Sequence, residues 1–488
     1  MPGRSRVAWP VRCLAVPASP GRYVAGRSWV SWPVLRCLPR LNLRRERSAG
    51  LVAVLWPWAS RWVGFRAEVR MGFPTGRRLF VLAAAVVVLV VVTAATVYRV
   101  LAPAEVSTPA AGTYPTAPAW DPAPGVIARL PAAPLVVDGR IRVYAAQRQV
   151  YADLPVTHQH RSTPYWSYRR WPAELVGVVA SGHTVVTRWS DGRIVTLDGR
   201  TGRVTWQAEG PVPEHDAAAR YTGATSVWNP DGLFVSPAEG TEVVLSAGGG
   251  ALAGWDLADG QRLWRSEVGE GCHRAVGTTT AGGLVSLDSC GAEATVDVRD
   301  AATGRVDRWR PPGASTTLAA TPLGCHAGRS GCAGLRTAAG PGDDAARGWL
   351  FGDGEPVAAP VLDRTDTVLA GGIAVGTLDG VLVGRDARTG AERWRREDVD
   401  GARVLAAEPD RVHLVTDRND LVTLDSANGD QRSRFVLTLG TDGTSWAPGA
   451  TYAVDGYLAV ERLRVPVASE ADDQRYFFTS RPVLLAAT

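Results

Sequence analysis

The chain has 488 residues, of which 45% are hydrophobic and 21% charged, a composition typical of a protein that folds around a core. Its 53 Gly, 33 Pro and 18 Trp favour a turn-dense all-β array over a helical bundle. All 53 basic side chains are Arg, and the absence of Lys excludes chemistry that depends on a Lys Schiff base or a P-loop Lys.

The net charge of +5 is unevenly distributed along the chain. Residues 1–70 contain 13 Arg and only two acidic residues, Glu46 and Glu68. After residue 100 the balance reverses, with 37 Arg against 46 acidic residues. Because the part long enough to fold into a large domain is mildly acidic, we do not expect nucleic acid as a partner.

Residues 1–70 form an Arg- and Trp-rich leader with no sustained helical or strand period, and we assign it no fold. Met71 precedes Arg77, Arg78 and an apolar run, the layout of a membrane-targeted N-terminus. One interpretation is that translation begins at Met71, and the other is a basic cytoplasmic segment that touches anionic lipid. Residues 71–78 are then a short cytoplasmic segment.

Residues 79–98 are uncharged and apolar, and at 1.5 Å rise per residue they are long enough to cross a hydrocarbon core of about 30 Å. Two Arg precede this run and only Arg99 follows it, so we expect a cytoplasmic N-terminus and an extracytoplasmic remainder. A single-pass cell-membrane protein with an uncleaved anchor is predicted. Cleavage near residues 102–104 is the alternative.

Residues 99–125 form a Pro- and Ala-rich linker that cannot sustain a helix or pair as a central strand. We expect a partly extended spacer here, with a cell-wall crossing as the simplest role. The folded domain is expected over residues 126–488.

A degenerate segment recurs in this domain, and it consists of a strand, a turn of the form Asp-x-x-(Thr/Asp/Asn)-Gly, and a second strand ending near Trp. The intervals between its glycines are 58, 44, 86 and 39 residues. Because 86 is two steps of 43, a degenerate unit is expected near residue 347, in an array with a period near 40–45 residues. Five copies are visible: 194–206, 252–264, 295–309, 382–394 and 421–435.

Each residue of the motif has a physical reason. Asp accepts hydrogen bonds from backbone N–H groups of the turn, and Gly supplies a positive φ. The turn pairs are Asp198 and Gly202, Asp256 and Gly260, Asp300 and Gly304, Asp386 and Gly390, and Asp425 and Gly429. The aromatic residues Trp206, Trp264, Trp309 and Trp394 are expected to pack between neighbouring repeat units rather than to stack on a ligand.

These segments resemble the pyrrolo-quinoline quinone (PQQ) type repeat, and the chain is similar to a membrane-anchored bacterial member of that family. The resemblance implies a β-propeller of four-stranded antiparallel blades. We expect seven blades, with residues 135–147 completing the last one. Eight blades are the alternative, if the segment before residue 172 forms a blade of its own.

Four cysteines lie beyond the apolar run, where an oxidising compartment favours disulfides. Cys272 and Cys290 flank a turn signal symmetrically, so we expect them to pair, as we expect of Cys325 and Cys332. A zinc site is the alternative, since Cys272 and Cys325 are each followed by His, but the spacing is poor. The motif His158-Gln-His160 is expected in a solvated loop, and no metal site is predicted.

The resemblance implies two kinds of function. A quinoprotein dehydrogenase would need an adjacent Cys-Cys pair and, in haem-containing types, Cys-x-x-Cys-His, and both are absent from the sequence. We therefore expect no catalysis and no cofactor. The leading hypothesis is an anchored extracytoplasmic propeller that binds a protein, cell-wall component or small molecule, and a sensor ectodomain acting through a partner protein is the other.

Overall fold

The computed structural model describes residues 76–117, 122–214, 221–238, 240–340, 346–352, 354–399, 401–438, 445–468 and 471–488. The predictions for the leader and for Met71 lie outside these residues.

The helix α1 (Gly76–Leu101) contains the apolar run. Within the described residues it is the one helix long and apolar enough to cross a membrane, over Leu79–Arg99. It consists mostly of Ala, Val and Leu without an acidic residue in its first turn, and the side chains from Leu79 to Arg99 are exposed. By its length and composition this helix could span a membrane.

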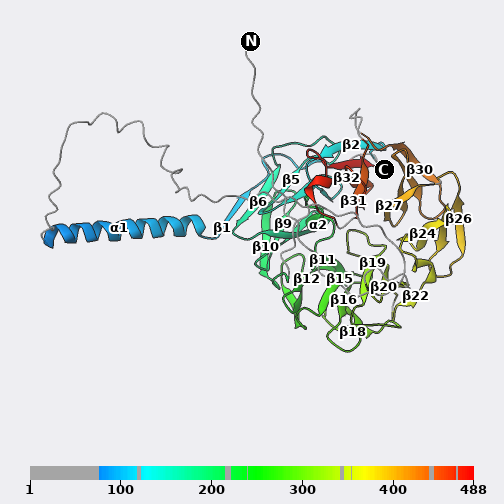
Figure 1. Ribbon diagram of the computed structural model, residues 1–488, viewed down its shortest axis with the longest axis horizontal. Helices are drawn as coiled ribbons and strands as arrows, with labels where there is room; N and C mark the ends of the chain where they lie inside the picture. Colours follow the sequence, from blue (N-terminus) through cyan, green and yellow to red (C-terminus); the bar gives the residue numbers. More distant parts are fainter. Residues whose placement is uncertain are drawn as a thin grey trace, which may run out of the picture. The chain divides into compact units, whose positions relative to one another are not determined.

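Beyond α1 the described chain forms eight antiparallel sheets, which follow one another in chain order around a ring (Figure 1). The all-β propeller is therefore confirmed, with eight blades, the alternative to the seven expected. Blades 1 to 4 comprise β3 (Leu135–Val137), β4 (Ile141–Ala146), β5 (Gln149–Asp153) and β6 (Trp166–Trp171); β7 (Leu175–Ser181), β8 (Thr184–Trp189), β9 (Arg193–Asp198) and β10 (Arg203–Glu209); β11 (Leu233–Ala238), β12 (Thr241–Gly248), β13 (Ala251–Asp256) and β14 (Arg262–Glu267); β15 (His273–Thr278), β16 (Gly283–Asp288), β17 (Thr295–Asp300) and β18 (Val306–Trp309).

The second half of the ring repeats this arrangement, and the degenerate unit expected near residue 347 lies in blade 5. Blades 5 to 8 comprise β19 (Ala319–Leu323), β20 (Gly334–Ala338), β21 (Arg347–Leu350) and β22 (Val357–Ala358); β23 (Val368–Ala370), β24 (Ile373–Leu378), β25 (Val381–Asp386) and β26 (Glu392–Arg396); β27 (Arg403–Glu408), β28 (Arg411–Val415), β29 (Asp420–Asp425) and β30 (Gln431–Val436); β31 (Ala447–Val454), β32 (Tyr457–Leu463), β33 (Val483–Ala487) and β2 (Gly125–Leu130). Short helical turns are α2 (Ala224–Val227), η1 (Pro360–Leu362) and η2 (Gln474–Tyr476).

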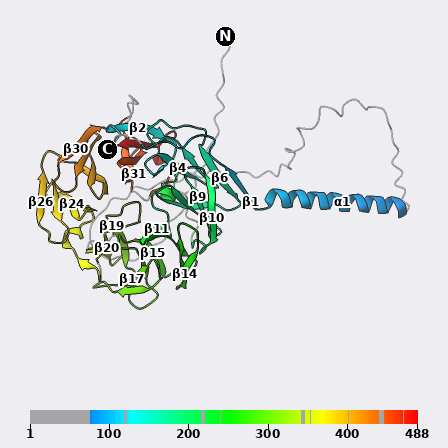
Figure 2. The ribbon, with the colours of Figure 1, turned by 180° about the vertical axis from the view of Figure 1, so that it is seen from behind.

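The ring is closed by β2, which pairs with β33 and so joins the start of the domain to its end. The expectation that residues 135–147 complete the last blade is wrong. Those residues form β3 and β4, which pair with each other and then with β5, so they belong to blade 1. Ala128 and Leu130 of β2 are almost fully buried, which explains why this short strand is held in the last blade. Seen from behind, β2 again lies in the same blade as β31, at the opposite edge of its sheet (Figure 2).

Part of the segment expected to be a spacer is a strand, β1 (Ala104–Thr108). It pairs antiparallel with β6 and gives blade 1 a fifth strand at its outer edge. An edge strand tolerates the flanking prolines, because only one side of it must pair.

The first strand of each blade is the innermost one, and neighbouring first strands such as β7 and β11 contact each other. Because successive strands are antiparallel, the turns joining strands one and two and strands three and four lie on the same face of the ring. We call it the upper face. The other connections lie on the lower face.

Candidate functional site

The motif turns lie on the upper face, at the outer end of the blades. In each of the five copies the Gly N–H donates to the Asp carbonyl, at 2.7–3.0 Å. The glycines have φ of 69–75°, a conformation that other residues adopt only at a cost. These are the turns at Gly202, Gly260, Gly304, Gly390 and Gly429.

The motif tryptophans connect neighbouring blades at these turns. The Trp206 indole N–H donates to the carbonyl of Leu257 at 2.8 Å, next to the motif Asp of the following blade. A Cβ on Gly260 of that blade would lie 2.6 Å from the Trp206 ring, so only Gly fits beneath it. Trp264 over Gly304 and Trp394 over Gly429 have the same arrangement, with indole bonds of 2.7 and 2.8 Å to Ala301 and Ser426.

One motif tryptophan departs from this arrangement, and one tryptophan outside the motif shares it. Trp309 packs edge-on against Trp349 of blade 5, at a centroid distance of 4.7 Å. The ring of Trp166 in blade 1 lies over Gly202 of blade 2, and its indole N–H donates to the carbonyl of Gly199. The sequence did not indicate this contact, because no motif turn precedes Trp166 in blade 1. All these residues are structural contacts between blades, so a ligand site must be sought elsewhere.

A funnel of about 700 Å³ opens on the upper face at the centre of the ring. Its wall is made by the innermost strands and first turns of blades 1, 2, 3 and 8, and by a loop of blade 5. The lining segments are 135–139, 179–182, 233–237, 326–331 and 452–455. None of the motif residues lines it, and the sequence carries no periodic signal for it.

Val227 and Trp228 line the funnel, and they belong to the segment 221–228, which we call the plug. It belongs to the connection from β10 to β11, which starts on the lower face. Trp228 is 1% exposed, and its indole N–H donates to the carbonyl of Pro134 at 2.8 Å. Thr222 donates to the buried carboxylate of Glu461, and its own carbonyl accepts from Ala133 at 2.9 Å. Hydrogen bonds therefore tie the plug to blade 8 and to the segment that precedes β3.

Arg188 of β8 holds the chain around the plug. Its guanidinium is almost fully buried and donates to the carbonyls of Pro211, Asp231 and Gly232, each at 3.0 Å. Burial lowers the pKa of Arg188 to about 10, against the opposing charges of Asp231 and Glu214. Carbonyl acceptors on both sides of the plug thus bind the two terminal nitrogens of a buried cation that has no direct carboxylate partner.

One wall of the funnel is closed by a disulfide. The structure contains both expected bridges, Cys325–Cys332 and Cys272–Cys290, and so confirms the pairing. The loop 325–332 is tied to β15 through Thr278, whose N–H donates to the carbonyl of Arg329 at 2.9 Å and whose carbonyl accepts from Cys332 at 2.7 Å. A Cβ on Gly328 would collide with the carbonyl oxygen of Trp228, so this loop rests directly on the plug.

The Cys272–Cys290 bridge lies on the lower face, at the open end of the β15–β16 hairpin. It therefore lies on the face of the ring opposite to the funnel, and neither cysteine lines the funnel. Its Cα–Cα distance of 5.1 Å is that of facing strand residues, as the symmetric spacing predicted.

The rim of the funnel is acidic. Asp138, Glu242 and Asp455 line it on blades 1, 3 and 8, against one Arg, Arg329, and His326. Asp138 forms an ion pair with Arg140 at 3.2 Å, and Arg329 lies 3.8 Å from Asp231.

Asp455 is the rim carboxylate with the most distinctive electrostatics. It occupies a turn with φ of 52°, followed by Gly456. Partial burial, followed by the negative charges of Glu408 and Asp138, raises the pKa of Asp455 above the usual value of an aspartate. A cation that binds beside Asp455 would relieve this repulsion.

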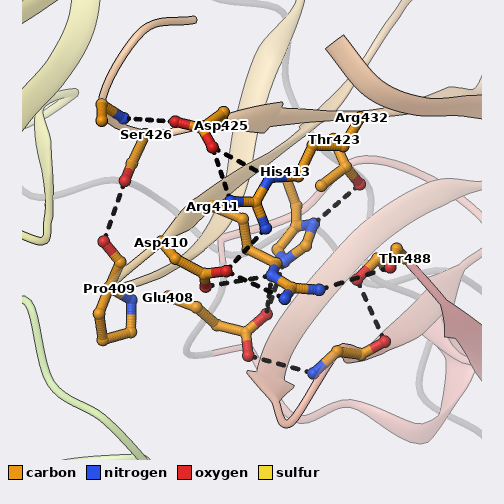
Figure 3. A network of polar contacts seen from close by, with 12 residues as sticks. Glu408, Pro409, Asp410, Arg411, His413, Thr423, Asp425, Ser426, Arg432 and Thr488 are labelled. Atoms are coloured by element: carbon orange, nitrogen blue, oxygen red, sulfur yellow. Dashed lines mark hydrogen bonds and ion pairs between the residues drawn. The ribbon is translucent and has the colours of Figure 1, made fainter. Parts of the chain in front are cut away.

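A polar network in blade 7 contacts the turn of the rim that carries Asp455 (Figure 3). Buried Glu408 accepts from Gly456 N at 3.3 Å and bonds His413 at 3.0 Å, and the other ring nitrogen of His413 lies 3.1 Å from Thr423. At the outer end of the network, Arg432 bridges Asp410 and Asp425 at 2.7 and 2.6 Å. The network fixes the position of the turn that carries Asp455.

His158 and His160 lie in the upper-face loop between β5 and β6. The Nδ1 of His160 is 3.0 Å from buried Asp153, which also pairs with Arg142 at 2.7 Å. The side chain of His158 is exposed. Among the residues that the structure describes, no group of three or more His, Cys, Asp or Glu side chains could hold a metal ion.

The chain matches one family model and is similar to several solved structures. A family model described as "Outer membrane protein assembly factor BamB" matches residues 53–310. No curated protein matches the sequence.

Among solved structures, BamB from Moraxella catarrhalis is 15% identical, with a TM-score of 0.40 over 75% of this chain and 99% of that chain. The quinohemoprotein alcohol dehydrogenase ADHIIG from Pseudomonas putida HK5 is 12% identical, with a TM-score of 0.36 over 75% and 76% of the two chains. The quinohemoprotein alcohol dehydrogenase from Comamonas testosteroni is 14% identical, with a TM-score of 0.34 over 79% and 76%. These likenesses carry no argument about function.

Proposed function

This chain belongs to the PQQ-like β-propeller family, and from that premise we propose that it is a membrane-anchored, extracytoplasmic binding module. The proposed site is the upper-face funnel. The observation that supports this role most is the funnel itself, a cavity of about 700 Å³ with apolar residues in its wall and an acidic rim.

The proposed anchoring rests on α1 and on the disulfides. A helix with twenty successive uncharged residues meets the length requirement for a bilayer. Disulfides persist outside the cytoplasm, which supports an exported propeller and a cytoplasmic N-terminus.

The proposed ligand is a protein segment that combines an apolar side chain with a basic group. Val179 and Val454, which are partly exposed, offer apolar wall, while Asp138 and Asp455 offer negative charge at the rim. The description of the matching family model names an assembly factor, and a protein partner agrees with that description.

We propose no quinone cofactor for this chain. PQQ carries three carboxylate groups, and the funnel meets them with Asp138, Glu242 and Asp455 against the one guanidinium of Arg329. One face of Trp228 is covered by the ring of Tyr452, so it offers no open aromatic platform there. The residues present do not fit the cofactor, and a dehydrogenase is the less favoured function.

The test is site-specific photo-crosslinking in native membranes. A photoreactive residue replaces Asp455 at the rim, or Asp379, which has φ of 51° and precedes Gly380 in a turn on the lower face. Both positions impose the same backbone strain, so the pair is matched. The proposal expects a discrete adduct from position 455 and none from 379. Equal adducts from both, or none from 455, would overturn it.

A further inference from the structure

The connection between the membrane helix and the propeller is short. The helix α1 ends at Leu101 and β1 begins at Ala104, so Ala102 and Pro103 alone lie between them. Three Cα–Cα steps span at most about 11 Å. Wherever α1 leaves a bilayer, the start of β1 lies close to that point.

β1 is also fastened to the propeller. It pairs with β6 over its whole length. Glu105 accepts from Arg170 at 3.2 Å and from Gln207 of blade 2 at 3.1 Å. Burial alone would raise the pKa of Glu105, but hydrogen bonds from Gln207 and Tyr168 and the charge of Arg170 lower it below its usual value. The carboxylate therefore stays ionised and joins β1 to two blades.

The two faces of β1 differ because successive side chains alternate. Glu105 turns toward blade 2, so Ala104 and Val106 lie on the other face. In the strand register Ala104 is opposite Trp171, and Val106 is opposite Arg169. These four residues share one face of the outer strand pair.

That face carries apolar and basic groups. Val106 is 54% exposed and Trp171 is 41% exposed. The guanidinium of Arg148 lies 4.4 Å from the centre of the Trp171 ring, and Arg169 is exposed. We call Val106, Arg148, Arg169 and Trp171 the edge patch. Trp is enriched at the membrane–water interface, and Arg is attracted to anionic lipid headgroups.

We propose that the edge patch rests on the phospholipid surface that α1 crosses, with Trp171 and Val106 at the headgroup level and Arg148 and Arg169 on lipid phosphates. This rests on the proposed anchoring of α1. Because β1 enters the propeller from the lower face, the contact leaves the funnel, on the upper face, directed away from the bilayer.

The test uses the full-length chain, with Cys13 and Cys37 replaced by Ser, in vesicles of phosphatidylcholine with or without phosphatidylglycerol. A nitroxide is attached at Val106→Cys. The matched control is Val357→Cys, a valine that is 47% exposed on the outer strand of blade 5, four blades away around the ring. Spin-label accessibility to oxygen and to a water-soluble nickel chelate is measured at both sites.

We expect the label at position 106 to gain oxygen accessibility and lose nickel accessibility in vesicles relative to detergent, and the label at 357 to keep both. Arg169→Gln is expected to lower the fraction in contact about fivefold at phosphatidylglycerol-containing surfaces, as one lost basic residue implies. Co-flotation with vesicles reports insertion of α1 separately. A chain that floats with equal accessibility at 106 and 357 overturns the edge contact alone, whereas a chain that does not float overturns the anchoring and this proposal together.

Discussion

The ring of Trp228 stacks on the ring of Tyr452, with centroids 5.9 Å apart and an angle of 4° between the planes. Trp228 comes from the plug between blades 2 and 3, and Tyr452 from the innermost strand of blade 8. This contact therefore links the plug to the blade that closes the ring.

Trp228→Ala is expected to destabilise the propeller by about 3–5 kcal/mol, the usual cost of removing a large buried aromatic side chain. Its indole hydrogen bond and its stacking are lost together. Trp171→Ala is the control, since Trp171 is 41% exposed and its removal leaves no comparable cavity. The midpoints of urea unfolding of the two variants in detergent measure the difference. Equal shifts for both variants would contradict a stabilising plug.

Gly429→Ala is expected to cost more than Gly390→Ala, although the two glycines occupy the same motif position with φ of 75° and 73°. Both substitutions incur about 1–2 kcal/mol of backbone strain. At Gly429 the new Cβ would lie 2.7 Å from the Trp394 ring, whereas at Gly390 the nearest atom, of Val361, is 3.5 Å away. We expect about 1–3 kcal/mol of additional loss at Gly429 from overpacking. Thermal unfolding compares the stabilities of the two variants. Similar losses of stability would rule out the Trp394 ring as the reason why glycine is needed at position 429.

The two disulfides are expected to differ in their effect on binding. Replacing Cys325 and Cys332 with Ser frees the loop that forms one funnel wall, so the adduct formed from position 455 is expected to fall. Replacing Cys272 and Cys290 opens a hairpin on the lower face, and the adduct should persist. Both changes cost stability, on the order of 2–4 kcal/mol. An adduct that survives loss of the first bridge and not the second would place the ligand away from the funnel.

Asp410 is expected to make stability fall in acid. Burial alone would raise its pKa, but hydrogen bonds from Arg411 and Arg432 lower it to about 2. Its contribution is complete above the unfolded-state pKa of about 4 and is lost as the pH falls toward 2. Because Asp410 is largely exposed, we expect its ion pairs to contribute about 1 kcal/mol or less to the free energy of unfolding. Unfolding of Asp410→Asn and the parent chain should converge near pH 2, and a constant difference from pH 6 to 2 would refute this assignment.

The blade architecture could be predicted because its signals are local. Asp386 and Gly390 are four residues apart, and their turn is formed by hydrogen bonds within the motif. The expected blade count of seven was wrong, since β2 directly follows the Pro- and Ala-rich stretch and reaches blade 8 only through its pairing with β33. No local pattern distinguishes that strand from a spacer.

The funnel could not be predicted, because the plug beside it is held by contacts between residues that are distant in the sequence. Trp228 and its acceptor Pro134 are 94 residues apart, and Thr222 and Glu461 are 239 apart. The plug also lacks a helical or strand period. Only the disulfide loop at Cys325 and Cys332 could be recognised, and nothing in the sequence placed it at the centre of the ring.

The most direct test of an exported propeller with an occupied funnel is thiol labelling of intact cells by a membrane-impermeant maleimide, at Asp455→Cys and Asp379→Cys. The account predicts that both positions react from outside. It also predicts that position 455 reacts more slowly in cells than in the purified protein, while 379 reacts at the same rate in both. Labelling that requires cell lysis would contradict the extracytoplasmic location, and an unchanged rate at 455 would contradict a ligand in the funnel.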